Sequence, residues 1–443
     1  MALPAAEARR QLERMLAIAK QVAKGADVEL ELEHEASGHT RFACNEISTA
    51  GEVERMSLSL RLSFGQRSAA VRFTQLDPDS LRAAAVRCSA MARVAPEQPE
   101  RMPLLGPQRY PQLAAVDPQL RAASASLRAQ AAADAIRRAE AAGQVIAGFL
   151  EHGHQSLSIA NSAGLWGHQE RTRGSFDCTA RTPDGTGSGW AGGQSNRWAD
   201  FDVAGLTAIA IDKAARARSP KRLPPGRYSV VLEPAAAGEL LSVLVSALDE
   251  RSADEGRSFF SKSGGGTRVG ERLWPESIEL DADPSDPALC RRPWSRELLP
   301  LTAARWIEAG KLSRLPRSRY WAAHKQQQPL AEPAGLRFRG GDSSLAQLVG
   351  GVQRGVLITR FWYLNFLDPN TLLCTGLTRD GTFLIERGEI VGPVNNFRWN
   401  ESPHTLLKNC DGLSASVIAP GFELRVPAIR SHEFNLASVS EAI

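Results

Sequence analysis

The chain has 443 residues, with 53 Lys and Arg against 49 Asp and Glu, and its net charge is +4. This small excess argues against a nucleic-acid-binding protein, which needs a concentrated basic face. No segment approaches the roughly 18 consecutive apolar residues of a membrane span, and the N-terminal segment lacks the apolar core of a signal peptide. The six cysteines are far apart and form no CxxC pair, which is typical of the reducing cytoplasm. We therefore expect a cytoplasmic protein with neither a nucleic-acid nor a membrane partner.

The N-terminal half alternates helical and strand patterns. Apolar residues at helical spacing predict an amphipathic helix that ends at Gly25, and strict alternation over residues 27–33 predicts a half-buried strand after it. A long Ala-rich helix is expected from Pro118 to Ala142. Beyond it, strands at 145–150 and 155–160 are expected to flank a turn at residues 151–154.

The C-terminal half begins after a segment rich in Pro and basic residues, 218–226, which has the composition of a domain boundary. A strand is expected at 228–232 and a helix at about 234–248, followed by short strands separated by Gly and Pro. Because no regular βαβ alternation is present, a parallel doubly wound sheet is disfavoured. The sequence predicts an α+β fold with mostly antiparallel sheets and flanking helices, in two domains, 1–218 and 219–443.

Residues 34–39 spell HExxxH, a string that resembles a zinc-peptidase motif. The string continues the predicted strand, where His34 and His39 are separated by an odd number of residues and therefore point to opposite faces. Only a turn at Ser37 and Gly38 would bring the two imidazoles together. We therefore expect a strand end and hairpin turn here, while a stand-alone zinc metallopeptidase that uses His34, Glu35 and His39 remains an open alternative.

Several stretches of the chain, in order, resemble the TldD/PmbA family of metallopeptidase-related proteins. They are residues 41–47, 73–81, 161–165, 225–234, 237–241, 257–259 and 375–390. The resemblance implies a cytoplasmic assembly of two kinds of subunit, of which the TldD-like one carries zinc and the PmbA/TldE-like one lacks it. It also implies proteolysis of extended or unfolded peptides, including maturation of peptide natural products and antitoxin turnover.

The resemblance further implies that a TldD-like chain carries its HExxxH motif on the helix matching 234–248. At those positions this chain has Ser242 and Ala247 in place of the two histidines and Val243 in place of the glutamate. Neither alanine nor valine has a donor atom, and a serine hydroxyl is a poor zinc ligand. The segment 414–420, where the resemblance implies a third ligand, a cysteine, has none. We therefore expect a PmbA/TldE-like subunit that has no catalytic residue and no metal or cofactor of its own, with zinc held by a TldD-like partner.

The run from Arg360 to Phe366 is the remaining candidate surface. Its aromatic residues are typical of a core strand. The same run could instead form a sheet edge that holds an extended peptide or a partner subunit by main-chain pairing, with Arg360, Trp362, Tyr363 and Asn365 as the contact residues. A non-enzymatic binding or regulatory module remains a further alternative for the whole chain.

Overall fold

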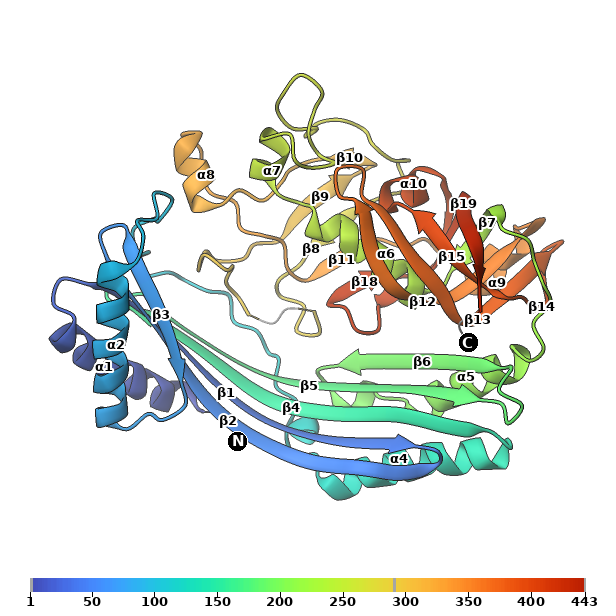
Figure 1. Ribbon diagram of the computed structural model, residues 1–443, viewed down its shortest axis with the longest axis horizontal. Helices are drawn as coiled ribbons and strands as arrows, with labels where there is room; N and C mark the ends of the chain where they lie inside the picture. The colour runs from blue at the N-terminus through green and yellow to red at the C-terminus, as the bar shows by residue number, and fades with distance from the viewer. Residues whose placement is uncertain (1–2, 290–291, 442–443) are drawn as a thin grey trace.

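The computed structural model describes residues 3–289 and 292–441, and its strands form three sheets. Most strand pairs are antiparallel, and helices flank the sheets, so the predicted α+β class is confirmed. One sheet is built entirely from the N-terminal half and the other two from the C-terminal half. Figure 1 shows the long N-terminal sheet as a curved layer whose concave side faces the C-terminal half.

The N-terminal sheet has the strand order β3-β2-β1-β4-β5-β6, and every neighbouring pair is antiparallel. Its strands are β1 (Asp27–Ala43), β2 (Glu46–Phe64), β3 (Arg67–Phe73), β4 (Val145–Asn161), β5 (Trp166–Arg181) and β6 (Ser188–Ser195). Alternate residues of each strand point to opposite faces. Helices cover one of these faces, here called the helix-side face, and the other is called the open face. The open face looks toward the C-terminal half (Figure 1).

Two groups of helices bury separate apolar areas of the helix-side face. The helices α1 (Ala5–Val22) and α2 (Pro78–Val94) pack on one end of the sheet, and α3 (Pro118–Arg121), α4 (Ala125–Ala141) and α5 (Val203–Arg216) lie at the other end. The helix expected over 118–142 is thus interrupted. Ser124 accepts a hydrogen bond from the Leu127 N–H at 3.2 Å and starts α4 as a new helix, because a side-chain cap satisfies the first N–H groups.

The turn expected at residues 151–154 is wrong. Strand β4 runs through this segment without a break and pairs with β1 on one side and β5 on the other. His152 and His154 are buried on the helix-side face, where His152 Nδ1 lies 3.2 Å from Arg128 Nη1 and His154 Nε2 lies 3.2 Å from Glu170 Oε2. Pairing on both edges outweighs the local turn preference of the glycine between the two histidines.

The larger sheet of the C-terminal half has the order β12-β7-β19-β15-β13-β14, with β16 beside β19. Because β12 also pairs with β13, the strands β12, β7, β19, β15 and β13 close into a ring. The strands are β7 (Gly226–Leu232), β12 (Arg354–Asp368), β13 (Leu373–Glu386), β14 (Glu389–Pro393), β15 (Asn396–Glu401), β16 (Cys410–Leu413) and β19 (Ile429–Ser440).

A smaller sheet completes this half, in the order β10-β9-β8-β11-β18-β17. Its strands are β8 (Leu280–Ala282), β9 (Ala304–Glu308), β10 (Lys311–Leu312), β11 (Leu336–Phe338), β17 (Val417–Ile418) and β18 (Leu424–Val426). Short helices lie around the two sheets: α7 (Glu250–Asp254), α8 (Arg319–His324), α9 (Leu345–Gly350) and α10 (Pro403–Lys408), while η1 (Trp198–Asp200) precedes α5 in the N-terminal half.

Helix α6 (Pro234–Ser246) packs between the strand ring and the smaller sheet. Pro234 starts it, since the N–H that proline lacks would be unpaired in a first turn. Leu240, Leu241 and Leu244 are fully buried in the main core of this half. A Cβ on Gly238 would lie 2.4 Å from the Cβ of Ala419, so glycine lets the helix approach the segment before β18 closely.

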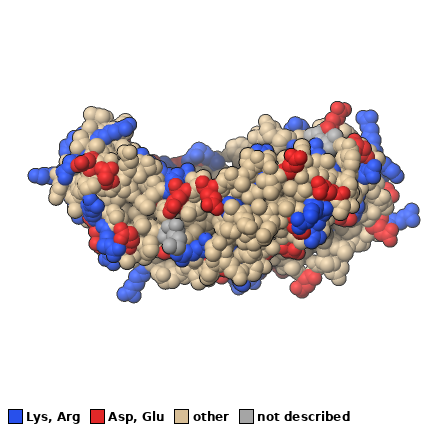
Figure 2. Space-filling view, turned by 90° about the horizontal axis from the view of Figure 1, so that it is seen from below, with Lys and Arg blue, Asp and Glu red and all other residues tan. Residues whose placement is uncertain are grey.

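The surface shows no concentration of one charge on the face seen in Figure 2, where Lys and Arg are interspersed with Asp and Glu. Among the described residues, no helix combines the length and the apolar character needed to span a bilayer. The described cysteines, Cys44, Cys88, Cys178, Cys374 and Cys410, are all free thiols. Cys290 lies outside the described residues.

Candidate functional site

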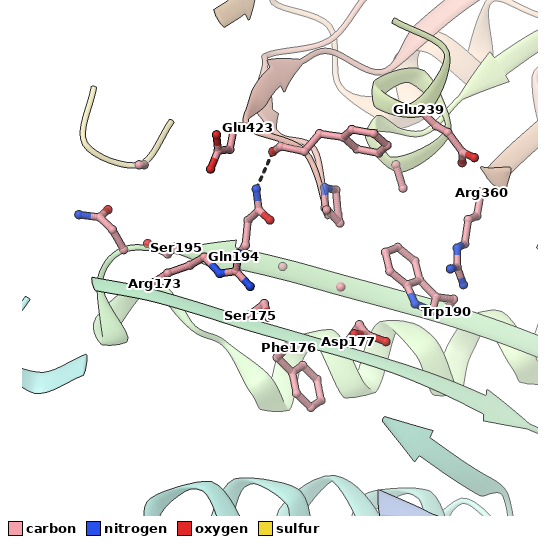
Figure 3. A pocket seen from close by; sticks show the side chains of 18 of the residues that line it. Arg173, Ser175, Phe176, Asp177, Trp190, Gln194, Ser195, Glu239, Arg360 and Glu423 are labelled. Carbon is pink, nitrogen blue, oxygen red and sulfur yellow. Dashed lines mark hydrogen bonds between the residues drawn. The ribbon is translucent and has the colours of Figure 1, made fainter. Parts of the chain in front are cut away.

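A cavity of about 460 Å³ lies between the open face of the N-terminal sheet and the C-terminal half. Strands β5 and β6 form one wall, and α6, β12 and the loop between β17 and β18 form the other (Figure 3). Its charged lining residues are Arg171, Arg173, Asp177, Glu239, Arg360 and Glu423, and the side chains of Trp190 and Gln194 also line it. The two halves of the chain therefore build this site together.

Glu239 is the only charged residue of α6 and points from the helix into the cavity (Figure 3). Burial raises the pKa of Glu239 to about 7, and the positive charge of Arg360 opposes this effect in part. Its carboxylate accepts no hydrogen bond from any of the described residues. It is thus a partly buried carboxylate with no direct partner among the described residues.

Asp177 faces the same space from β5. Burial raises the pKa of Asp177, while the charge of Arg360 and a hydrogen bond from the Trp190 indole lower it. Two carboxyl groups with raised pKa values therefore line the cavity, Asp177 from β5 and Glu239 from α6.

Arg360 lies between these walls on β12. Its guanidinium carbon is 4.3 Å from the centre of the Trp190 ring, and its Nη1 donates to Asp380 Oδ2 at 3.0 Å. Asp380 is 2% exposed and also accepts a hydrogen bond at 2.6 Å from the hydroxyl of Ser188, on β6. The closest anionic partner of Arg360 is therefore Asp380, which holds the C-terminal strands to the N-terminal sheet.

The part of the cavity lined by Arg171, Arg173 and Glu423 carries paired charges. Arg171 Nη1 lies 3.4 Å from Glu423 Oε1, and Arg173 Nη2 lies 2.8 Å from Glu151 Oε1. The side-chain amide of Gln194 donates to the backbone oxygen of Phe422 at 2.5 Å, the bond drawn as a dashed line in Figure 3. The contacts of Arg171 with Glu423 and of Gln194 with Phe422 join the two halves of the chain. The contact of Arg173 with Glu151 joins β5 to β4 within the N-terminal sheet.

The three positions that the resemblance compares with the zinc motif lie further along α6. The Ser242 hydroxyl donates to the backbone oxygen of Glu239 at 2.7 Å, so it is engaged within the helix. Val243 is 5% exposed and belongs to the main core, and Ala247 is the C-terminal cap of the helix. Among the residues that the structure describes, no three His, Cys, Asp or Glu side chains are grouped closely enough to hold a metal ion.

The HExxxH string at residues 34–39 lies within β1 of the N-terminal sheet, whereas α6 belongs to the C-terminal half of the chain. His34 is buried on the helix-side face, where its Nε2 lies 3.1 Å from Glu54 Oε1. His39 is on the open face, with its ring stacked on Phe149 at 5.7 Å between centres. The strand end and turn expected here are wrong, since β1 continues to Ala43 and pairs on both edges. With no turn inside the string, its two imidazoles stay on opposite faces.

The candidate contact residues on β12 fall into two groups. Arg360 and Trp362 line the cavity, while Tyr363 and Asn365 continue outward on an exposed part of the strand. Trp362 is 43% exposed and Tyr363 is 62% exposed. The first half of β12 pairs with β7 and β13, but the second half pairs only with β13, which leaves one edge of it open. The run is therefore a core strand at its start and an exposed edge at its end.

Asp177, Trp190 and Glu239 were not among the residues singled out in the sequence. Glu239 alone had a local signal, as the one charged residue of an otherwise apolar helix. Asp177 and Trp190 had none, because their proximity to α6 depends on how the two halves meet.

Comparison with known structures finds the same fold in several solved proteins. A candidate modulator of DNA gyrase from Thermotoga maritima aligns with a TM-score of 0.84 at 16% identity, covering 96% of this chain and 99% of that one. TldE from Thermococcus kodakarensis aligns with a TM-score of 0.84 at 18% identity and the same coverage. A candidate modulator of DNA gyrase from Bacteroides thetaiotaomicron aligns with a TM-score of 0.78 at 20% identity, covering 96% of this chain and 98% of that one. These similarities show a shared fold.

The family is identified from the sequence. Residues 113–218 match the PmbA/TldA metallopeptidase central domain, and residues 225–438 match the PmbA/TldA metallopeptidase C-terminal domain. The chain belongs to the PmbA/TldD family. A comparison with curated protein sequences gives no match.

Proposed function

We propose that this chain is a non-catalytic, PmbA/TldE-like subunit that pairs with a zinc-bearing TldD-like subunit to hydrolyse extended or unfolded peptides. The observation that carries the proposal is the chemistry of α6. At the three positions that a TldD-like chain fills with two histidines and a glutamate, this chain has a serine bonded to its own helix, a buried valine and an alanine. None of these side chains could bind zinc and activate water there.

Two further observations support the proposal. The HExxxH string of β1 divides its histidines between opposite faces of the sheet, which disfavours a separate zinc site. The fold is similar along nearly its whole length to that of TldE from Thermococcus kodakarensis. In such an assembly, this chain would help to enclose the space in which a partner's zinc acts, with the exposed end of β12 as a candidate contact surface. We infer that the assembly works in the cytoplasm, on peptides of the kind matured into natural products or on antitoxins.

The metal content of the purified assembly tests this proposal. The chain would be co-purified with a TldD-like subunit, and zinc would be quantified by elemental analysis. We expect one zinc per pair, lost when the histidines of the partner's motif are replaced and kept in the His34→Ala and His39→Ala variants of this chain. Zinc that follows His34 of this chain, or a failure of the two subunits to associate, would overturn the proposal.

A further inference from the structure

A serine, a histidine and an aspartate are joined by hydrogen bonds on the outside of the strand ring. The hydroxyl of Ser229, on β7, lies 3.0 Å from His432 Nδ1, on β19. The other ring nitrogen, His432 Nε2, lies 2.8 Å from Asp411 Oδ2, on β16. Ser229 is on the opposite face of β7 from its neighbour Val230, which belongs to the main core. None of the three residues lines the cavity between the two halves of the chain.

The two distances fit one form of the neutral imidazole. The proton on Nε2 is donated to the Asp411 carboxylate, so Nδ1 carries a lone pair and accepts the hydrogen bond from the Ser229 hydroxyl. In this form the His432 ring can take the hydroxyl proton, and Asp411 stabilises the positive charge that the ring would then carry. Nucleophile, base and carboxylate follow in the order that activates serine in acyl transfer, with the roles of the two ring nitrogens exchanged.

A β-bulge holds the imidazole in place. Strand β19 pairs with β7 at Ser431 and again at Phe434, so His432 and Glu433 together stand opposite Ser229. Glu433 has a φ of 59°, a left-handed conformation that is uncommon outside glycine. Bulges redirect side chains and are frequent beside active sites. The strand is therefore irregular at the residue whose side chain lies between Ser229 and its carboxylate.

Asp411 is fixed by a second contact. Arg430 Nε donates a hydrogen bond to Asp411 Oδ1 at 2.7 Å, while Oδ2 faces the imidazole. Partial burial opposes the charge of Asp411, but the hydrogen bonds from Arg430 and His432 prevail and lower its pKa below the ordinary value. The carboxylate is therefore ionised at neutral pH and oriented toward the ring.

The three side chains can be reached from the solvent. The side chain of His432 is 50% exposed and that of Asp411 is 39% exposed, and Ser229 is partly exposed. Arg227 lies two residues before Ser229 on the same face of β7, and its Nη1 donates to the backbone oxygen of Glu433 at 2.9 Å. Its positive charge lies on the side where an anionic oxygen would form, and such a charge stabilises acyl-transfer intermediates. A small acyl donor can therefore approach the hydroxyl directly.

We propose that Ser229 is an activated nucleophile that takes the acyl group of small, activated carboxylic esters. The Ser229 oxygen forms a bond to the carbonyl carbon while its proton passes to His432 Nδ1. The bond from that carbon to the leaving oxygen then breaks, the leaving alcohol takes the proton from His432, and the acyl group stays on Ser229 as an ester.

This reactivity goes beyond the proposed function and does not depend on it. Cleavage of a peptide amide requires an enclosed oxyanion site and protonation of the leaving amine. An activated ester has a leaving group that departs without such help. The open surface around Ser229 therefore suits ester chemistry and leaves peptide hydrolysis to a metal-bearing partner.

Reaction of the full chain with p-nitrophenyl acetate at about pH 7.5 tests the inference. The release of p-nitrophenol is followed by absorbance, and acetylated residues are located by mass spectrometry of proteolytic fragments. We expect Ser229→Ala and His432→Gln each to slow the release at least about tenfold, because general-base assistance typically contributes a factor of about 10² to 10⁴. Ser229 is the serine whose acetylation is expected in the wild type.

Two matched variants control for the general reactivity of serine and histidine side chains. Ser126→Ala removes an exposed serine of α4, and His324→Gln removes an exposed histidine of α8. Both are expected to release p-nitrophenol as fast as the wild type does. If His432 reacted alone as the nucleophile, Ser229→Ala would keep the full rate, so the pair of variants separates the two chemistries.

The inference is overturned if either Ser229→Ala or His432→Gln releases p-nitrophenol as fast as the wild type. Neither result bears on zinc in a partner subunit, so the proposed pairing would stand or fall separately.

Discussion

We expect the carboxylate of Glu239 to make the stability of the protein depend on pH. Burial raises its pKa from the ordinary value of 4.5 to about 7 in the folded protein. The folded state therefore disfavours the ionised form, and the protein loses stability as the pH rises from below 4.5 to above 7. Since a tenfold change in an ionisation equilibrium is worth about 1.4 kcal/mol, this difference corresponds to about 3 kcal/mol above pH 8. Solvent in the cavity screens the charge, so this figure is an upper bound.

Glu239→Gln cannot ionise and should escape this loss. We expect the variant to be more stable than the wild type by about 1 to 3 kcal/mol near pH 8.5 and to differ little near pH 5. Urea denaturation followed by tryptophan fluorescence at the two pH values measures the difference, with Glu140→Gln as the surface control. A stability gain of equal size at both pH values, or a loss near pH 8.5, would refute the reasoning, because neither follows from an ionisation penalty in the folded state.

Three further substitutions test the packing and charge contacts. Gly189→Ala is expected to cost about 2 kcal/mol or more by urea denaturation, because its Cβ would lie 2.3 Å from a backbone oxygen of α5. Gly106→Ala, in open space, is its control, and equal costs would contradict the packing. Arg360→Met leaves Asp380 buried without its closest cation and is expected to destabilise the fold by about 3 kcal/mol near pH 7; a change under about 1 kcal/mol would argue against this pair. Asp77→Ala removes the cap of α2 and is expected to lower the free energy of unfolding by about 1 kcal/mol, and an unchanged value would contradict the capping role.

The sequence was a good guide to element type and a poor guide to strand length. The alternation after Gly25 marks β1, but that strand extends to Ala43, through the expected turn at Ser37 and Gly38. The same error occurs at residues 151–154 in β4. In both cases a glycine and polar neighbours suggested a turn. Cross-strand pairing on both edges, which depends on residues far along the chain, overrides that local preference.

The candidate site was predictable only where the chemistry is local. The lack of zinc ligands at Ser242, Val243 and Ala247 can be read from the residues themselves once the resemblance aligns them. The opposite orientation of His34 and His39 also follows from strand geometry alone. The cavity could not be predicted, since it is formed where the open face of one sheet meets α6 and β12 of the other half.

Peptide hydrolysis by this chain, alone and together with a TldD-like subunit, tests most directly whether the chain is a non-catalytic subunit. An unstructured peptide would be incubated with the purified chain, with the zinc-bearing subunit, and with the two mixed in equal amounts, and products would be followed by mass spectrometry. We expect no cleavage by this chain alone, and cleavage by the mixture that depends on the partner's metal motif. Cleavage by this chain alone that is abolished in His34→Ala, at a rate unchanged by the partner, would contradict this expectation.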